Sequence, residues 1–139
     1  MIEITHKPIS PEEVVNKTKG DNSGCVVTYV GLIRNQSQGK TVLAVEYNDS
    51  AGTAENVLRE IAGIAKSRWP VNNIAISHRV GKLSVGEINL VIAVASAHRR
   101  EGFAACQYII DRFKQKLPTQ KRETYQDGNR VENRDTDTV

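Results

Sequence analysis

Five basic residues in three parts of the chain have the side chains best suited to chemistry on an anion. His98 and Arg99 follow an apolar run and precede a helical pattern, where free backbone amides and the helix dipole favour a negative group. Lys114 falls near the end of the same helical pattern, and Lys121 follows it in a basic segment. Arg34 begins a polar loop. Each position also suits an ordinary solvated charge. Local spacing alone therefore predicts no more than a domain that binds an anion.

Other kinds of site find little support in the sequence. His6 and His78 have no second ligand at metal-binding spacing. Cys25 and Cys106 lie far apart inside apolar segments, which indicates buried thiols rather than a zinc site or a redox pair. The sequence contains no phosphate-binding loop, dinucleotide fingerprint or Gly-x-Ser-x-Gly motif. We therefore expect neither a metal nor a cofactor.

Length and composition narrow the class of protein. The 139 residues, 39% hydrophobic and 25% charged, predict a single domain over residues 1–139. No apolar run reaches the roughly 20 residues that span a bilayer. The first residues lack a secretory signal, so we expect a soluble, cytoplasmic protein without a membrane contact. A net charge of +3, with one Trp, four Tyr and two Phe, gives little support for nucleic-acid binding.

Hydrophobic periodicity predicts the elements that must position the basic residues. A short helix is expected from Pro11, with Ser10 as its cap. The most regular pattern predicts a helix over 53–69, and a last long helix is expected with Ser96 as its cap. The apolar face of this last helix is predicted to contain Phe103, Cys106, Ile110, Phe113 and Leu117. Strands are predicted at 2–5, 25–33, 41–47, 74–80, 87–95, 122–125 and 130–132.

The connections between these elements indicate the fold class. Residues 34–40 are predicted to form a surface loop, and residues 81–86, with a glycine at each end, a tight reversal. Strands joined by short turns favour antiparallel pairing, with the helices gathered on one face. The sequence therefore predicts an α+β fold with a mainly antiparallel sheet, helices packed on it and a C-terminal β-hairpin.

Short blocks of sequence carry a resemblance to a known family. The blocks are Gly31-Leu32-Ile33-Arg34-Asn35, His78-Arg79-Val80-Gly81-Lys82-Leu83, Ser96-Ala97-His98-Arg99 and Pro118-Thr119-Gln120-Lys121-Arg122-Glu123, with Arg68-Trp69-Pro70 as a further match. In this order and spacing, the chain from about Cys25 to Glu132 resembles the large, catalytic subunit of molybdopterin synthase, the MoaE family. The resemblance implies an α/β-hammerhead fold.

The same resemblance implies a reaction and its partners. The family is a sulfurtransferase that converts cyclic pyranopterin monophosphate to the dithiolene of molybdopterin, in molybdenum cofactor biosynthesis. The sulfur arrives on a small ubiquitin-like subunit whose C-terminal Gly-Gly ends in a thiocarboxylate. Two small subunits bind at opposite ends of a central homodimer of large subunits. This chain would then be the central part of a heterotetramer.

Carried over residue by residue, the resemblance assigns roles to six positions. The catalytic lysines of the family fall on Lys114 and Lys121. The residues that bind the anionic substrate fall on Arg34, His98 and Arg99, and a further arginine, supplied across the dimer, corresponds to Arg134.

Two positions depart from the family pattern. Gln120 stands where the family commonly has an aromatic residue just before the second lysine. The tryptophan usual after the turn at Gly128 is also absent. These differences keep an alternative open, a non-enzymatic basic dimeric module that binds a ubiquitin-like protein or RNA.

Overall fold

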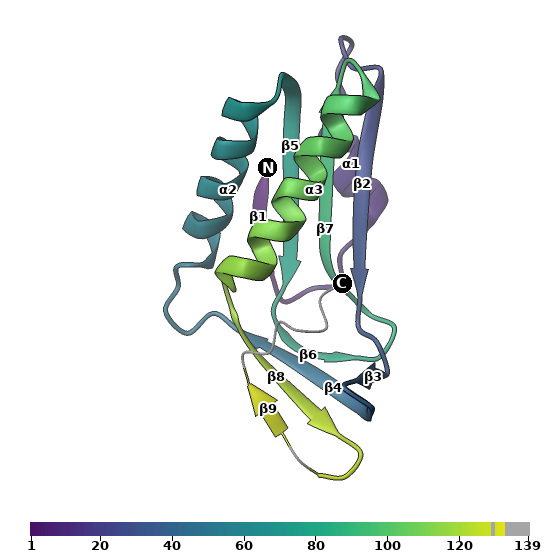
Figure 1. Ribbon diagram of the computed structural model, residues 1–139, viewed down its shortest axis with the longest axis vertical. Helices are drawn as coiled ribbons and strands as arrows, with labels where there is room; N and C mark the ends of the chain where they lie inside the picture. Colours follow the sequence, from purple (N-terminus) through teal and green to yellow (C-terminus); the bar gives the residue numbers. More distant parts are fainter. Residues whose placement is uncertain (129, 133–139) are drawn as a thin grey trace.

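The described residues form two β-sheets, one above the other in Figure 1, and three helices. The computed structural model describes residues 1–128 and 130–132. The first sheet has the order β1-β5-β7-β2, from β1 (Ile2–Thr5), β5 (Val71–Arg79), β7 (Ile88–Ser96) and β2 (Cys25–Leu32). The second has the order β3-β4-β8-β9, from β3 (Gln36–Ser37), β4 (Lys40–Asn48), β8 (Gln120–Tyr125) and β9 (Arg130–Glu132), and β6 (Gly81–Ser84) also pairs with β4. The helices are α1 (Pro11–Asn16), α2 (Ala54–Arg68) and α3 (Arg99–Lys116).

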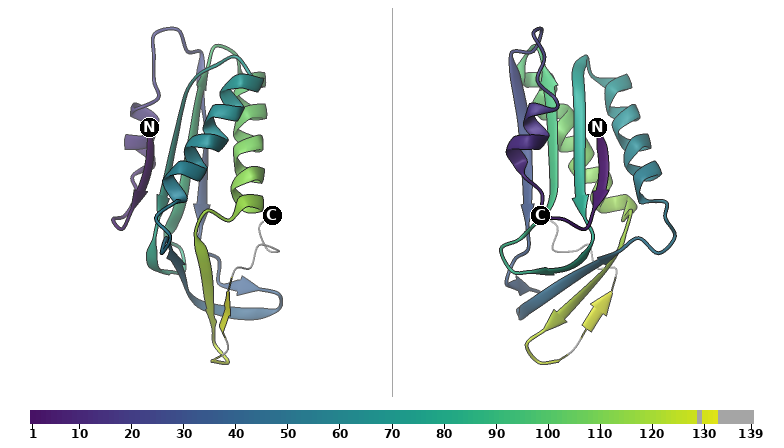
Figure 2. Two further views of the ribbon diagram at one scale, coloured as in Figure 1. Left: turned by 90° about the vertical axis from the view of Figure 1, so that its left-hand side faces the viewer. Right: turned by 180° about the vertical axis from the view of Figure 1, so that it is seen from behind.

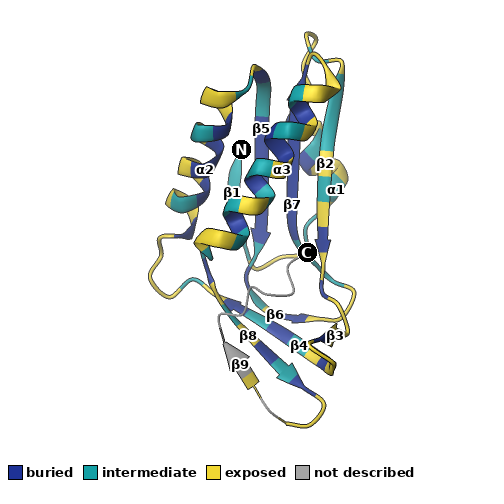
Figure 3. Ribbon diagram, viewed as in Figure 1, coloured by how far each residue is buried: buried dark blue, intermediate teal, exposed yellow. Residues whose placement is uncertain are grey.

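The first sheet carries the main core because both of its faces are covered. Residues 91–95 of β7 are fully buried, as expected for a strand enclosed on both sides (Figure 3). α2 and α3 pack on one face, and α1 packs on the other through Val14, against Val91 and Ala93 (Figure 2). The expectation that all helices lie on one face is therefore wrong for α1. The apolar side chains on the second face of β7 need a cover, and α1 provides it.

The two helix starts predicted from the sequence have different outcomes. The start of α1 is confirmed, because the backbone N–H of Glu13 donates to the Ser10 hydroxyl at 3.3 Å and Pro11 opens the helix. The predicted cap of α3 is wrong. Ser96 is the last residue of β7, and its hydroxyl donates to the His98 carbonyl at 2.7 Å. His98 is instead the N-cap residue, without a side-chain capping bond.

The buried face of α3 also differs from the prediction at one position. Cys106 and Phe113 face the core as expected, but Phe103 is 61% exposed. The neighbouring Gly102 is buried in its place. A Cβ built on Gly102 would lie 2.7 Å from the Ser96 hydroxyl oxygen, so this side of α3 approaches the sheet too closely for a large side chain.

The second sheet contains two strands that the sequence did not predict. β3 forms within the expected loop 34–40 and pairs with the start of β4. The expected tight reversal at 81–86 is wrong, because β6 crosses to the second sheet and pairs with residues 44–47 of β4. Leu83 explains this path, since it is fully buried against Val45 and Tyr125.

The fold class predicted from the sequence is confirmed. Among the described strands, the pair β1 and β5 is parallel and all other pairs are antiparallel. The C-terminal hairpin is present, with β8 and β9 paired from Arg122 and Glu132 to Thr124 and Arg130. The chain therefore has the α+β architecture expected of an α/β-hammerhead.

Candidate functional site

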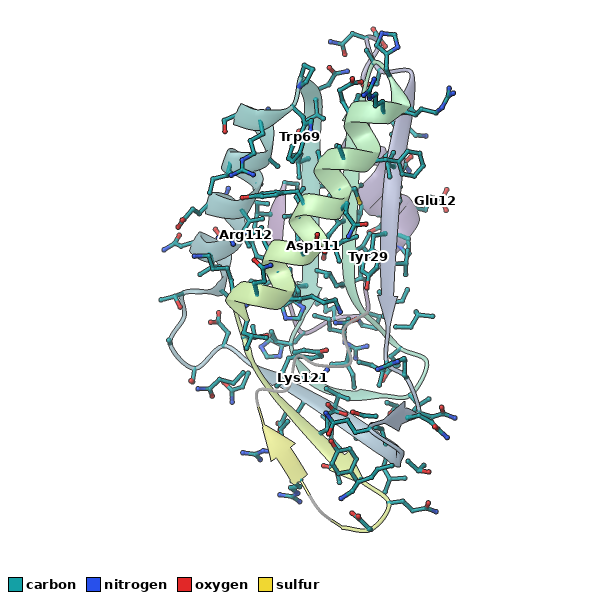
Figure 4. All side chains as sticks on the ribbon, in the orientation of Figure 1. Glu12, Tyr29, Trp69, Asp111, Arg112 and Lys121 are labelled. Atoms are coloured by element: carbon teal, nitrogen blue, oxygen red, sulfur yellow. The ribbon has the colours of Figure 1, made fainter. Side chains whose placement is uncertain are left out.

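A pocket of about 310 Å³ lies where the two sheets and the C-terminal end of α3 meet. Its wall combines the end of β2, parts of β3, β4, β7 and β8, and the last turn of α3. Figure 4 shows Lys121 at this junction, below the end of α3. Three of the five predicted basic residues line the pocket: Arg34, Lys114 and Lys121.

Each of the three cations comes from a different part of the fold. Arg34 lies just beyond the end of β2, Lys114 is in the last turn of α3, and Lys121 is near the start of β8. The helix ends at Leu117, whose left-handed φ of 47° stops the helix. Pro118 follows and cannot continue it. Because the chain leaves the helix abruptly here, Lys114 of α3 and Lys121 of β8 both line the same cavity.

Lys114 is the most perturbed of the three cations. Its pKa lies below the ordinary lysine value, first because burial disfavours the charged amine and then because of the charges of Lys121 and Arg34. Among the described residues, Lys114 has no carboxylate within ion-pair distance. An anion in the pocket would therefore stabilise its charged form.

Glu123 is the acidic residue in the pocket wall. It is 3% exposed, and its Oε1 lies 3.7 Å from Nζ of Lys121, beyond hydrogen-bond distance. One carboxylate against three cations leaves the pocket with an excess of positive charge. The sequence alone gives no reason to single out Glu123, because an acid two residues from a lysine on a strand is common on protein surfaces. Only the fold shows that Glu123 is buried.

A neutral polar network supports the inner wall of the pocket. The His78 ring lies between the carbonyl of Asn89 and the hydroxyl of Thr119, at 2.8 and 2.9 Å. The Asn89 amide donates to the Tyr47 hydroxyl at 3.1 Å. Burial lowers the pKa of His78 to about 4 and raises that of Tyr47, so both are uncharged at neutral pH. The only role that the sequence suggests for the His78 side chain is that of a metal ligand. It gives no sign of this network, because the members are far apart in the chain.

The structure does not bring His98 and Arg99 to this pocket within one chain. Both lie at the opposite end of α3, exposed, beside a shallow depression that also involves Gly24 and Cys25. Arg99 opens the helix and Lys114 lies in its last turn. The rise of about 1.5 Å per residue separates their backbones by roughly 22 Å. The five predicted residues therefore form two separate groups in the chain.

The remaining site expectations concern Arg134, metals and membranes. Arg134 lies outside the described residues. The described part of the chain contains no group of three His, Cys, Asp or Glu side chains placed to hold a metal ion. Within that part, no helix has the length and apolar character needed to cross a bilayer.

Fold and pocket together define a class of protein, an α+β domain with a pocket whose converging cations are suited to a small anion or an anionic chain end. The sequence profile of the MoaE protein family matches residues 4–116, which is most of the chain. The chain belongs to the MoaE family, and the resemblance of its sequence blocks is confirmed.

Individual relatives agree with this assignment. A molybdopterin synthase catalytic subunit from Nostoc sp. is 42% identical, over 90% of this chain and 76% of the relative. One from Thermoplasma volcanium is 37% identical, over 92% of this chain and 93% of the relative. The crystal structure of molybdopterin synthase from Staphylococcus aureus superimposes with a TM-score of 0.87 at 32% identity, covering 94% of each chain.

Proposed function

We propose that this chain is the catalytic subunit of a molybdopterin synthase, a sulfurtransferase of molybdenum cofactor biosynthesis. It would transfer sulfur from the thiocarboxylated C-terminus of a small ubiquitin-like subunit to cyclic pyranopterin monophosphate and form the molybdopterin dithiolene. The observation that carries the proposal is the convergence of Arg34, Lys114 and Lys121 in one pocket of a MoaE-family chain.

The charges of the pocket suit the chemistry of this reaction. The cyclic phosphate must open, sulfur must be added at two carbons, and the carrier must leave as a carboxylate after water attacks its acyl carbon. Negative charge develops at each step. Cations fixed in advance by the fold stabilise such states better than a single base does.

Separate roles follow for the three pocket cations. Lys114, with its lowered pKa, would hold the carboxyl end of the carrier and supply a proton where charge develops. Lys121 and Arg34 would hold the phosphate and the pterin. An arriving anion would raise the pKa of Lys114 again, so substrate binding and proton uptake at this amine are coupled.

His98 and Arg99 require a second copy of the chain in this proposal. They lie at the far end of α3 from the pocket, so one protomer cannot direct all five basic residues at one small substrate. A homodimer in which each protomer lends His98 and Arg99 to its partner's pocket would complete the site, with Arg134 as a further contribution. Small subunits at both ends would make the heterotetramer.

The proposed location is the cytoplasm, as predicted from the sequence. Cys25 and Cys106 are both free thiols in the structure, which suits a reducing compartment.

Reconstitution with defined components tests the proposal. The chain, its small partner as a thiocarboxylate and the cyclic pterin should give dithiolene product. Lys114→Ala or Lys121→Ala should lower turnover by at least about 100-fold, in the range for loss of a preorganised charge. Lys116→Ala is the matched control, because Lys116 lies in the same helical turn but is exposed and does not line the pocket.

The same assay separates the alternative function. Tight binding of the small subunit or of RNA without any product would indicate a non-enzymatic module. Near-normal turnover of both pocket variants would show that the two lysines are not the catalytic residues.

A further inference from the structure

His78 lies where four parts of the pocket wall meet. It is a fully buried residue of β5. Its ring packs edge-on against Tyr47 of β4 and Phe113 of α3, with ring centroids 5.0 Å apart in both pairs. Its two nitrogens reach the carbonyl of Asn89 in β7 and the hydroxyl of Thr119. The imidazole thus contacts both sheets, α3 and the α3–β8 connection.

The partners of His78 are the neighbours of the two pocket lysines. Phe113 directly precedes Lys114 on α3. Thr119 lies two residues before Lys121, and Tyr47 is the cross-strand partner of Lys121 in the β4–β8 pair. The imidazole is therefore in contact with the segments that carry both pocket lysines.

The tautomer of His78 follows from its partners. A carbonyl oxygen can only accept, so Nδ1 carries the proton that is donated to Asn89. Burial keeps the ring neutral, so Nε2 is bare and accepts the hydroxyl proton of Thr119. Thr119 therefore donates to His78, and His78 donates to Asn89. Valine at position 119 would keep the shape of threonine but remove the hydrogen bond from Thr119 to His78.

Residues 117–119, which connect α3 to β8, include a strained backbone conformation that the hydrogen bond between Thr119 and His78 can stabilise. Leu117 adopts a left-handed φ of 47°, a conformation that costs a non-glycine residue energy. Among the described residues, the Thr119 hydroxyl makes the side-chain hydrogen bond that holds residues 117–119. The strained turn is thus fixed from the His78 side.

We infer that His78 is a positioning residue for the lysine pair: through its hydrogen bond with Thr119 and its contact with Phe113, it fixes where Lys121 lies relative to Lys114. The inference rests on the proposed function, because it takes both lysines to act in this pocket. His78 touches neither lysine in this role and exchanges no proton with the substrate.

Variants at position 119 test the inference. We expect Thr119→Val to release the start of β8 and move the Lys121 charge away from Lys114. The pKa of Lys114, followed by NMR of lysine side chains labelled with carbon-13, should then rise toward its ordinary value. Arg34 is unchanged, so its lowering effect on the Lys114 pKa stays in place. In the reconstituted synthase, kcat should fall about 10-fold or more, as for a misplaced catalytic group.

Two further variants complete the design. Thr119→Ser keeps the hydroxyl and should restore both the Lys114 pKa and kcat. Thr124→Val makes the same chemical change on β8, the strand that carries Lys121, but outside the pocket lining, and should leave both at wild-type values. A Lys114 pKa that is unchanged in Thr119→Val would overturn the inference, whatever happens to turnover.

A measurement on the unaltered protein is independent of how the variants fold. Nitrogen-15 chemical shifts of His78 at neutral pH should show a protonated Nδ1 and a bare Nε2. The opposite tautomer, or a charged ring, would also overturn the inference. If the wild-type assembly makes no product, the proposed function fails, while the Lys114 titration still decides whether His78 and Thr119 position the lysines.

Discussion

At the residue scale, the pocket groups differ in how far water reaches them. Arg34 is exposed, Lys114 and Lys121 are half-buried, and Glu123 is buried. Buried and half-buried charges are less screened by water and salt than exposed ones. Lys114, Lys121 and Glu123 therefore contribute most to the field inside the cavity, where the two lysines outnumber the carboxylate. Arg34 can act at the mouth of the cavity and meet an anion as it enters.

His78 makes the stability of the protein depend on pH. Its pKa is about 4 in the folded state and 6.5 for a free side chain, so the unfolded chain binds more protons between these values. Stability from this group is complete above pH 6.5 and is lost as the pH falls toward 4, by about 3 kcal/mol in total. We expect the difference in unfolding free energy between wild type and His78→Gln to shrink over this range in urea titrations.

The exposed His98 supplies the control for this measurement. His98→Gln removes an exposed imidazole and leaves His78 in place, so the loss of stability toward pH 4 that is assigned to His78 should remain. If the difference in unfolding free energy between wild type and His78→Gln stayed constant from pH 7 to pH 4, the assignment of a buried, neutral His78 would be contradicted.

The sequence predicted the pocket cations but not the residues that support them. The family resemblance assigns catalytic roles to Lys114 and Lys121, since their local spacing also suits solvated charges. His78 and Thr119 stand in quoted blocks, but nothing local indicates the hydrogen bond between them, because it joins positions distant in the chain. Glu123 was part of a quoted block, but nothing in that block indicated its burial. Contacts between positions so distant in the sequence can be identified only once the fold is known.

At the element scale, two glycines inside helices serve opposite purposes. Gly63 in α2 has no atom within 4 Å of a Cβ built on it, whereas Gly102 in α3 would meet Ser96 and Val27 at 2.7 and 3.0 Å. We expect Gly63→Ala to stabilise the protein by about 0.5–1 kcal/mol through helix propensity. Gly102→Ala should destabilise it by about 1–3 kcal/mol through overpacking.

Urea unfolding of the two alanine variants checks this pair, with each serving as the control of the other. The same gain in helix propensity applies at both sites. The difference in unfolding free energy between Gly63→Ala and Gly102→Ala therefore measures the cost of the close approach of α3 to the sheet. If Gly102→Ala were as stabilising as Gly63→Ala, close packing would not be the reason for this glycine.

Errors in predicting elements also came from tertiary contacts. Ser96 looked like a helix cap because its type and position fit one, but its hydroxyl bonds to the His98 carbonyl instead. Residues 81–86 looked like a turn because of their glycines, but burial of Leu83 draws them into the second sheet as β6. Helices and long strands were predicted well, since their periodicity is visible within one segment.

At the scale of the whole molecule, a mixed dimer tests whether the site is shared. A chain with Arg99→Ala and a chain with Lys121→Ala should each be inactive as homodimers. If pockets take Arg99 from the partner, a mixed dimer regains one intact pocket, so randomly assembled chains should show about a quarter of wild-type activity. Mixing folded homodimers without subunit exchange is the control, and an inactive random mixture would show that the site is not shared.

The proposal of a single domain has its own test. The chain passes between the two sheets at β2–β3, β4–α2, β5–β6, β6–β7 and α3–β8, so neither sheet consists of one continuous segment. We expect one cooperative unfolding transition, with Trp69 fluorescence reporting the first sheet and the Tyr125 ring resonances reporting the second. Different midpoints for the two probes would indicate two independent units.

The same interleaving affects how the pocket arises during synthesis on the ribosome. β2 can pair with β7 only after β7 has left the ribosome, and β4 can pair with β8 only after β8 has been synthesised. Pairing between segments so distant in sequence folds slowly, because a long loop must close first. Lys121 is among the last pocket residues to be translated. A nascent chain that stops before β8 would therefore expose the unpaired edge of β4, with its apolar side chains available for aggregation until the final strand arrives.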